Sequence, residues 1–209
     1  MIDQMHLAVK KFILIVFRPL VWFFTHFKIS PNSISAIGFL INIAALLVLS
    51  QGYFVIGGLV ILLAGLFDML DGHIARNQNK ETKFGALLDS TLDRYSELLL
   101  FLGISIFLVR DILHNGTYYT KQLEIFGLLG IFFMISGSLM VSYVRARAEG
   151  LGLSCKVGLI QRPERVVGLA IGCFLPYPWI LYMIFFLAFT TNLTVLQRII
   201  HVYQTSRTK

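Results

Sequence analysis

Residues 67–94 read FDMLDGHIARNQNKETKFGALLDSTLDR, and this stretch places four aspartates between two apolar runs. The runs extend from Tyr53 to Phe67 on its N-terminal side and from Ser96 to Val109 on its C-terminal side. Where apolar segments enter a membrane, an unpaired carboxylate beside them is costly. The four aspartates therefore need a cationic partner or a function, and they are Asp68, Asp71, Asp89 and Asp93.

The composition of the whole chain indicates an all-α integral membrane protein. Of its 209 residues, 56% are hydrophobic, whereas soluble domains contain about 45–50% apolar residues. This length accommodates about six membrane-spanning helices of roughly 20 residues each, joined by short loops. We therefore expect a single membrane domain over residues 1–209, with a six-helix bundle at residues 30–205.

The apolar segments predict where these six transmembrane helices lie. Residues 1–28 are rich in aromatic side chains but are interrupted by charges and by Pro19, which is typical of an amphipathic helix in the membrane interface. Ser30 and Pro31 predict the start of the first span. Two prolines in LPYPW, residues 175–179, favour a tight turn between the last two spans. The expected spans are residues 33–50, 53–75, 84–109, 122–147, 164–182 and 179–200.

The distribution of basic residues predicts the orientation of the chain. When the six spans alternate, all of the 18 Lys and Arg residues except Arg110 and Lys121 fall on one side. The positive-inside rule then places both termini and the loops around 76–83 and 145–165 in the cytoplasm. We expect a multi-pass protein of the plasma membrane whose active site faces the cytoplasm. The net charge of +7 then meets membrane lipids and an anionic substrate, and not nucleic acid.

The spacing of the aspartates predicts a metal site. Asp68 and Asp71 are three residues apart, and Asp89 and Asp93 are four apart, so each pair shares one helical face. A short loop joins the two helices, which makes them antiparallel neighbours with converging faces. Two Mg²⁺ or Mn²⁺ ions would neutralise four carboxylates and suit displacement at phosphorus, with one carboxylate left as general base. The alternative is that the aspartates cap helix ends in solvent.

The same residues resemble a known family. At every fixed position the stretch resembles the signature of the CDP-alcohol phosphatidyltransferases, here Asp68-x2-Asp71-Gly72-x2-Ala75-Arg76-x8-Gly85-x3-Asp89-x3-Asp93. The resemblance implies transfer of a phosphatidyl group from CDP-diacylglycerol, or a related CDP-lipid, to an alcohol with release of CMP. It also implies two Mg²⁺ or Mn²⁺ ions per active site, and a homodimer.

The resemblance also implies a role for individual residues. Asp68, Asp71 and Asp89 are similar to metal ligands of the family, and Asp93 is similar to its general base, which also touches the second metal. The residues similar to its CDP-lipid contacts are Asn32, Ser33, Ile34, Ser35, Gly72, Arg76, Thr82 and Gly85.

Two further stretches bear on the acceptor alcohol. SYVRARAEGLGL, residues 142–153, and QRPERVV, residues 161–167, resemble the phosphatidylinositol-phosphate synthase branch, whose acceptor is inositol 1-phosphate. Arg145, Arg165 and Arg198 match the positions that hold the acceptor's phosphate in that branch, although the branch often has lysine at the first of them. Arginine suits a phosphate because its planar head offers several donors. The alternative is that these arginines only anchor helix ends at the membrane surface.

Three other functions share part of this pattern. Glycerol 3-phosphate as the acceptor would also need an arginine cluster. A divalent-cation transporter would carry acidic residues deep within several spans, whereas here the middle and far side of the spans read as nearly uncharged. A prenyl-diphosphate enzyme shares the pairing of aspartates with Mg²⁺ but does not explain Gly72, Arg76 and Gly85.

Overall fold

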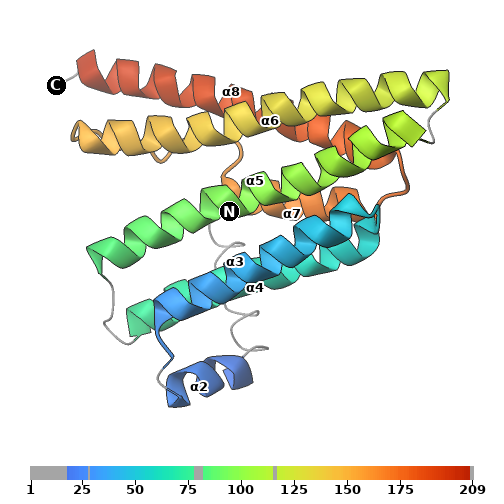
Figure 1. Cartoon of the computed structure of the whole chain (residues 1–209). Coiled ribbons are helices and arrows are strands. Elements are labelled where there is room, and N and C mark those ends of the chain that lie inside the picture. The colour runs from blue at the N-terminus through green and yellow to red at the C-terminus, as the bar shows by residue number, and fades with distance from the viewer. Residues whose placement is uncertain (1–17, 28, 78–81, 115–116, 208–209) are drawn as a thin grey trace.

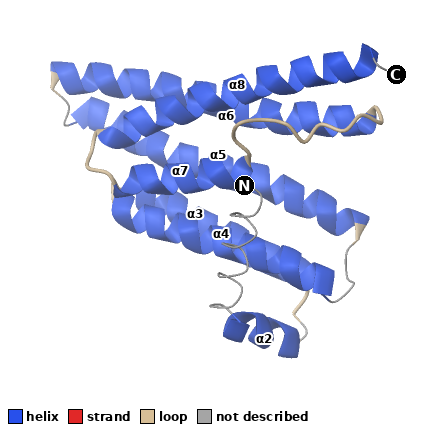
Figure 2. Cartoon of the chain, turned by 180° about the vertical axis from the view of Figure 1, so that it is seen from behind, coloured by secondary structure: helices blue, strands red, loops and turns tan. Residues whose placement is uncertain are grey.

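The computed structural model of the chain describes residues 18–27, 29–77, 82–114 and 117–207, and these residues are helical apart from short connections (Figures 1 and 2). The described helices are α2 (Arg18–His26), α3 (Pro31–Ser50), α4 (Phe54–Asn77), α5 (Lys83–His114), α6 (Tyr118–Gly150), α7 (Arg162–Phe174) and α8 (Trp179–Arg207). The predicted all-α class is therefore confirmed over the described part of the chain.

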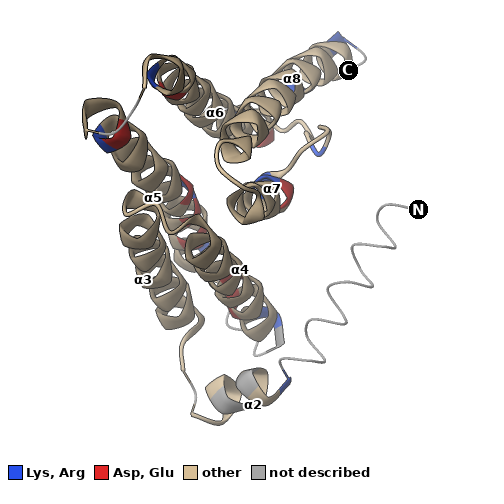
Figure 3. Ribbon diagram, turned by 90° about the vertical axis from the view of Figure 1, so that its right-hand side faces the viewer, with Lys and Arg blue, Asp and Glu red and all other residues tan. Residues whose placement is uncertain are grey.

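The helices form two groups that meet at α7. In the first group α3 packs against both α4 and α5, and in the second α6 packs along α8. The short helix α7 packs on α4 from one side and on α8 from the other, so it belongs to both groups (Figure 3). A continuous apolar core runs through the bundle and contains Leu49, Phe101, Met134 and Leu181.

Local sequence signals explain how α3 begins and how closely it approaches α5. Ser30 accepts a hydrogen bond from the backbone N–H of Ser33 at 3.1 Å, and Pro31 opens the helix, as predicted. Gly103 of α5 faces α3 so closely that a Cβ there would lie 2.7 Å from the carbonyl oxygen of Leu46. This glycine therefore fixes how near α5 comes to α3.

Four described helices are long and apolar enough to cross a membrane, namely α3, Phe54–Arg76 of α4, α6 and α8. Large apolar side chains on their outer faces are exposed, for example Leu40, Phe132 and Phe186. An outer surface of this kind suits lipid rather than water. The protein is thus an all-helical membrane protein.

The fifth predicted span ends earlier than expected. It was predicted to reach residue 182, but α7 stops at Phe174 after 13 residues, because Pro176 and Pro178 cannot continue a helix. The turn predicted at residues 175–179 is present, and α8 starts at Trp179. A helix of this length rises about 20 Å, less than the roughly 30 Å of a hydrocarbon core.

The N-terminal prediction is only partly covered, because residues 1–17 and 28 lie outside the described residues. Residues 18–26 form α2, whose Phe24 packs on Ile34 of α3 and on Leu70 and Ile74 of α4. This contact lays α2 beside the start of α3 and the C-terminal end of α4, which carries Asp68 and Asp71 (Figure 1).

The expectation that the middle and far side of the spans are nearly uncharged was wrong. Glu97 of α5 and Glu124 of α6 are both buried. The hydroxyl group of Tyr177, in the turn between α7 and α8, donates a hydrogen bond to Glu124. Single glutamates inside apolar segments hardly change the hydropathy of a span, which is why the sequence pattern did not reveal their burial.

Candidate active site

The predicted carboxylate pairs meet across a cavity, and their helices are not in close contact. Asp68 and Asp71 lie near the C-terminal end of α4, and Asp89 and Asp93 lie near the start of α5. Because α3 packs against both helices, it holds the two pairs at opposite walls. The expectation of converging faces was right, but the expectation of neighbouring helices missed the part that α3 plays.

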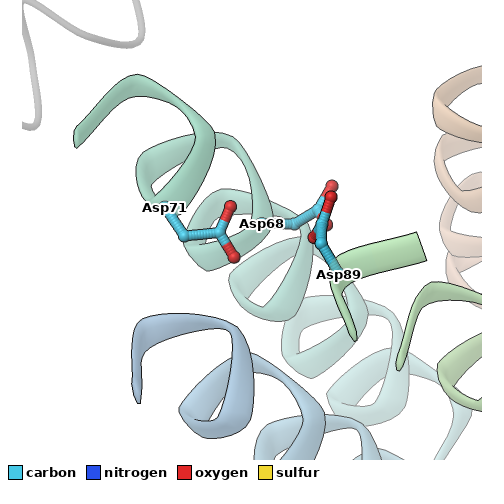
Figure 4. A group of neighbouring side chains, drawn as sticks. All are labelled: Asp68, Asp71 and Asp89. Atoms are coloured by element: carbon cyan, nitrogen blue, oxygen red, sulfur yellow. The ribbon is translucent and has the colours of Figure 1, made fainter. Parts of the chain in front are cut away.

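Three of the aspartates are arranged as a metal site. Asp68, Asp71 and Asp89 each offer a carboxylate oxygen, and the three oxygens lie within 4.8 Å of one another (Figure 4). Hard oxygen donors in this number are the ligands that Mg²⁺ and Mn²⁺ prefer. The side chains therefore fit a divalent cation.

A serine of α3 fixes one of these ligands. The Ser35 hydroxyl group donates a hydrogen bond of 2.6 Å to Oδ2 of Asp71, which is only 5% exposed. Ser35 was one of the predicted CDP-lipid contacts, and in the structure its hydroxyl group contacts Asp71, a candidate metal ligand. A hydrogen bond of this kind orients a ligating carboxylate.

The fourth aspartate, Asp93, is paired with an arginine and lies outside that group of three. Nη1 of Arg162 lies 2.8 Å from Oδ1 of Asp93, and the same nitrogen lies 3.1 and 3.0 Å from the two oxygens of Asp68. Arg162, at the first residue of α7, thus bridges the walls made by α4 and α5. The sequence gives no sign of this contact, because 94 positions separate Arg162 from Asp68 and no local spacing links them.

We call the site formed by Asp68, Asp71, Asp89 and Asp93 the cup. The residues predicted to contact the CDP-lipid lie in small groups around it. The backbone N–H of Gly85 donates to Oγ1 of Thr82 at 2.9 Å, and a Cβ at Gly85 would lie 3.1 Å from the side-chain oxygen of Asn32. A Cβ at Gly72 would lie 3.5 Å from both terminal nitrogens of Arg76, so that guanidinium group covers the glycine.

Two of the predicted contacts point elsewhere. The side chain of Ile34 is fully buried in the apolar cluster under α2. The hydroxyl group of Ser33 pairs with that of Ser30 at 2.8 Å at the start of α3. Any contact of Ile34 with a ligand would therefore involve its backbone.

The cavity itself lies between α3, α4, α5 and α7. The charged residues that line it are Asp68, Asp71, Asp89, Asp93, Glu97 and Arg162. It therefore extends from the carboxylate group past Arg162 to a fifth carboxylate, which the sequence analysis did not select. Glu97 follows Asp93 by four residues on the same face of α5, and this spacing was a signal that could have found it.

Glu97 binds Arg165, one of the three arginines predicted to hold the acceptor's phosphate. Nε and Nη2 of Arg165 lie 2.8 and 3.0 Å from the two oxygens of Glu97, and Nη2 lies 3.1 Å from Oγ of Ser138. Arg165 is 1% exposed, and its Nη1 is buried without a hydrogen-bond partner among the described residues. One donor of this arginine is thus free for a ligand.

The other two arginines, Arg198 and Arg145, have separate partners. Arg198 is buried, and its Nε donates to the carbonyl oxygen of Val157 at 2.9 Å. Arg145 forms an exposed ion pair of 2.9 Å with Glu149. Both Arg145 and Arg165 are within electrostatic reach of Arg198, so positive charge gathers where α6, α7 and α8 meet.

Comparison with known proteins places this geometry in context. A family model described as CDP-alcohol phosphatidyltransferase matches residues 28–206. An archaetidylinositol phosphate synthase of Methanothermobacter thermautotrophicus is 37% identical over 175 residues, which cover 82% of each chain. A phosphatidylinositol phosphate synthase of Mycolicibacterium smegmatis is 36% identical over 163 residues, which cover 72% of this chain and 66% of the relative.

Solved structures of a similar enzyme share the fold. The crystal structure of Mycobacterium tuberculosis phosphatidylinositol phosphate synthase with CDP-DAG bound has a TM-score of 0.76 and 28% identity, covering 88% of this chain and 92% of that one. The same enzyme in complex with manganese and citrate has a TM-score of 0.76 and 29% identity, covering 88% of both chains.

Proposed function

The chain belongs to the CDP-alcohol phosphatidyltransferase family, and on this premise we propose that it transfers a phosphatidyl-type group from a CDP-linked lipid to inositol 1-phosphate, with release of CMP. The observation that carries the proposal is the convergence of Asp68, Asp71 and Asp89 beside a cavity that reaches Glu97, the partner of Arg165. The donor and the acceptor are inferred from the names of the relatives and from the residues around this cavity.

We propose that the donor's diphosphate binds at the end of α4. The Arg76 guanidinium over Gly72 offers donors to a phosphate, and Gly72 leaves room for it. Asn32, Thr82 and Gly85 form a polar group that suits the cytidine part. The lipid is CDP-diacylglycerol or a related CDP-lipid, since the relatives include both an archaetidyl and a phosphatidyl enzyme.

We propose that Asp68, Asp71, Asp89 and Asp93 together hold two divalent ions, Mg²⁺ or Mn²⁺. When bound, such ions polarise a phosphate and stabilise the charge on the departing CMP oxygen. Ser35 keeps Asp71 oriented for this purpose. The support from a relative is that the M. tuberculosis enzyme was crystallised with manganese.

The proposed chemistry at this chain's own residues is a single displacement. Asp93 takes the proton from the acceptor hydroxyl group, whose oxygen forms a bond to the lipid-side phosphorus. The bond from that phosphorus to the oxygen of CMP breaks at the same time. Arg165, Arg198 and Arg145 hold the acceptor's phosphate, and Nη1 of Arg165, which has no hydrogen-bond partner among the described residues, is one of the donors that it binds.

We also propose an arrangement in the membrane. All six helices α3–α8 cross it as one domain over residues 1–209, and the fifth crossing combines α7 with the segments that flank it, because α7 alone is too short. Both termini and the cup face the cytoplasm, α2 lies in the membrane interface, and the plasma membrane is the site of action. Two copies form a homodimer.

The test is an acceptor comparison with purified protein. CMP release from CDP-diacylglycerol would be measured with Mn²⁺ or Mg²⁺ and with inositol 1-phosphate, free inositol, glycerol 3-phosphate or serine, each against an EDTA control. We expect divalent-dependent release only with inositol 1-phosphate. Faster release with glycerol 3-phosphate would move the proposal to a phosphatidylglycerophosphate synthase, the second acceptor that an arginine cluster fits.

A further inference from the structure

Arg162 contacts the same carboxylates that the proposed function assigns to metal ions, so this inference rests on that function. Its Nη1 touches both oxygens of Asp68 and one oxygen of Asp93. Asp68 is therefore shared between two groups: the three aspartates arranged for a cation, and the pair that Arg162 joins.

A guanidinium group and a divalent ion cannot both occupy the space between Asp68 and Asp93. Each neutralises the two carboxylates by lying between them, and the contacts of Arg162 already lie at 2.8–3.1 Å. Because Nη1 already contacts both oxygens of Asp68 and Oδ1 of Asp93, an ion that these two carboxylates ligate together competes with it.

The contacts of Arg162 indicate that its guanidinium group is easily displaced from Asp68 and Asp93. All of its described contacts to carboxylates involve one nitrogen, Nη1, while its buried Nε has no partner among the described residues. Its side chain is 25% exposed, and those of Asp68 and Asp93 are 39% and 18% exposed. A partly hydrated ion pair held by one nitrogen is easier to displace than a buried pair held by two.

We propose that Arg162 is a tethered counter-cation that neutralises Asp68 and Asp93 in the metal-free protein and is displaced when these two carboxylates bind the second divalent ion. Arg162 thereby lowers the affinity of that ion and stabilises the cup without metal. It is a positioning residue for Asp93, since it holds the proposed base until the ion arrives.

The first test measures Mn²⁺ binding by the purified full chain, with the electron paramagnetic resonance signal of free Mn²⁺ as the readout. In Arg162→Gln the second Mn²⁺ should bind at least about tenfold more tightly, because the ion no longer displaces a resident cation. Arg147→Gln is the matched control, because it removes the same charge from an exposed position of α6. It should leave Mn²⁺ affinity unchanged.

The second test separates this role from a plain structural tie. Thermal unfolding of Arg162→Gln should start at a lower temperature than wild type in EDTA, and saturating Mn²⁺ should remove most of that difference. An equal loss with and without Mn²⁺ would make Arg162 a structural residue only and overturn the proposal.

Arg162→Lys keeps the inference testable if the glutamine variant does not fold. Lysine retains the charge but reaches the two carboxylates as a single ammonium group, so Mn²⁺ should bind more tightly than in wild type by a smaller factor. Binding equal to or weaker than that of wild type would contradict the proposal. Failure of the wild-type protein to bind any Mn²⁺ would instead contradict the proposed function. The experiment therefore distinguishes failure of the Arg162 proposal from failure of the proposed function.

Discussion

Two arginines one helical turn apart on α7 pair with acidic residues one turn apart on α5, and the two pairs differ in their access to water. Arg162 joins Asp68 and Asp93 at the cup, where its side chain is 25% exposed. Arg165 joins Glu97 deeper in the bundle, where the side chains are 1% and 6% exposed. We call these the outer pair and the inner pair.

Because the two ion pairs differ in exposure, they suit different roles. A buried ion pair is expensive to break, because the remaining charge has no water to replace its partner. The inner pair is therefore suited to holding Arg165 in one orientation for the acceptor. The outer pair can exchange its partner, which a catalytic site that takes up metal ions requires.

The largest effect on activity is expected from substitution of Asp93, the proposed general base, which breaks the outer pair. Asp93→Asn should lower the rate of CMP release about 10²–10⁴-fold, which is typical for loss of a general base. Binding of the CDP-lipid, measured by the thermal shift that it causes, should be retained. Asp111→Asn removes a carboxylate near the far end of the same helix and serves as the control. Weaker lipid binding with a normal rate per bound complex would contradict the role of Asp93.

Breaking the inner pair should reduce stability more than it changes metal binding. Glu97→Gln leaves Arg165 buried without its counter-charge and should cost about 3–5 kcal/mol in the free energy of unfolding. Glu149→Gln breaks the exposed pair with Arg145 and should cost less than about 1 kcal/mol. Denaturant unfolding in detergent measures both. Similar small losses in the two variants would remove the distinction between the buried pair and an exposed one.

A milder change at the inner pair should affect the acceptor selectively. Arg165→Lys keeps the charge but loses the fork that grips Glu97 and offers Nη1. We expect the KM for inositol 1-phosphate to rise about tenfold, the equivalent of one lost charged hydrogen bond, with the KM for the CDP-lipid unchanged. Equal increases in both values would refute the assignment of Arg165 to the acceptor.

The smallest effect should come from a residue that supports the cup alone. Ser35→Ala removes the hydrogen bond to Asp71 and should weaken Mn²⁺ binding by about 1 kcal/mol, or roughly fivefold. Ser33→Ala is the matched control on the same helix, since Ser33 pairs with Ser30. The control should leave Mn²⁺ affinity unchanged, and an equal change in both variants would indicate a general effect on α3.

Local signals predicted most of the helices and the centre of the site. The cap at Ser30, the turn at residues 175–179 and the paired spacing of the aspartates all act over a few residues, and such features can be read from a single chain. The end of α7 was missed because the apolar composition continues from α7 through the turn into α8.

The contacts that could not be predicted join distant parts of the chain. Arg162 and Asp68 lie 94 positions apart, and Arg165 and Glu97 lie 68 apart. The residues of each pair meet only because α7 packs on α4 and faces the cavity. Arg165 was predicted to hold the acceptor's phosphate, but no partner was predicted for either arginine, because tertiary packing selects the partner.

The close contact between α3 and Gly103 of α5 affects the position of residues far along α5. Gly103 follows Asp89 by 14 residues, which is about 21 Å along the helix axis. A methyl group there would meet the backbone of Leu46 and tilt α5 outward, and the tilt would carry Asp89 away from its two companions. Mg²⁺ tolerates only small errors in ligand distance, so the geometry of the candidate metal site depends partly on the absence of a side chain where α5 meets α3.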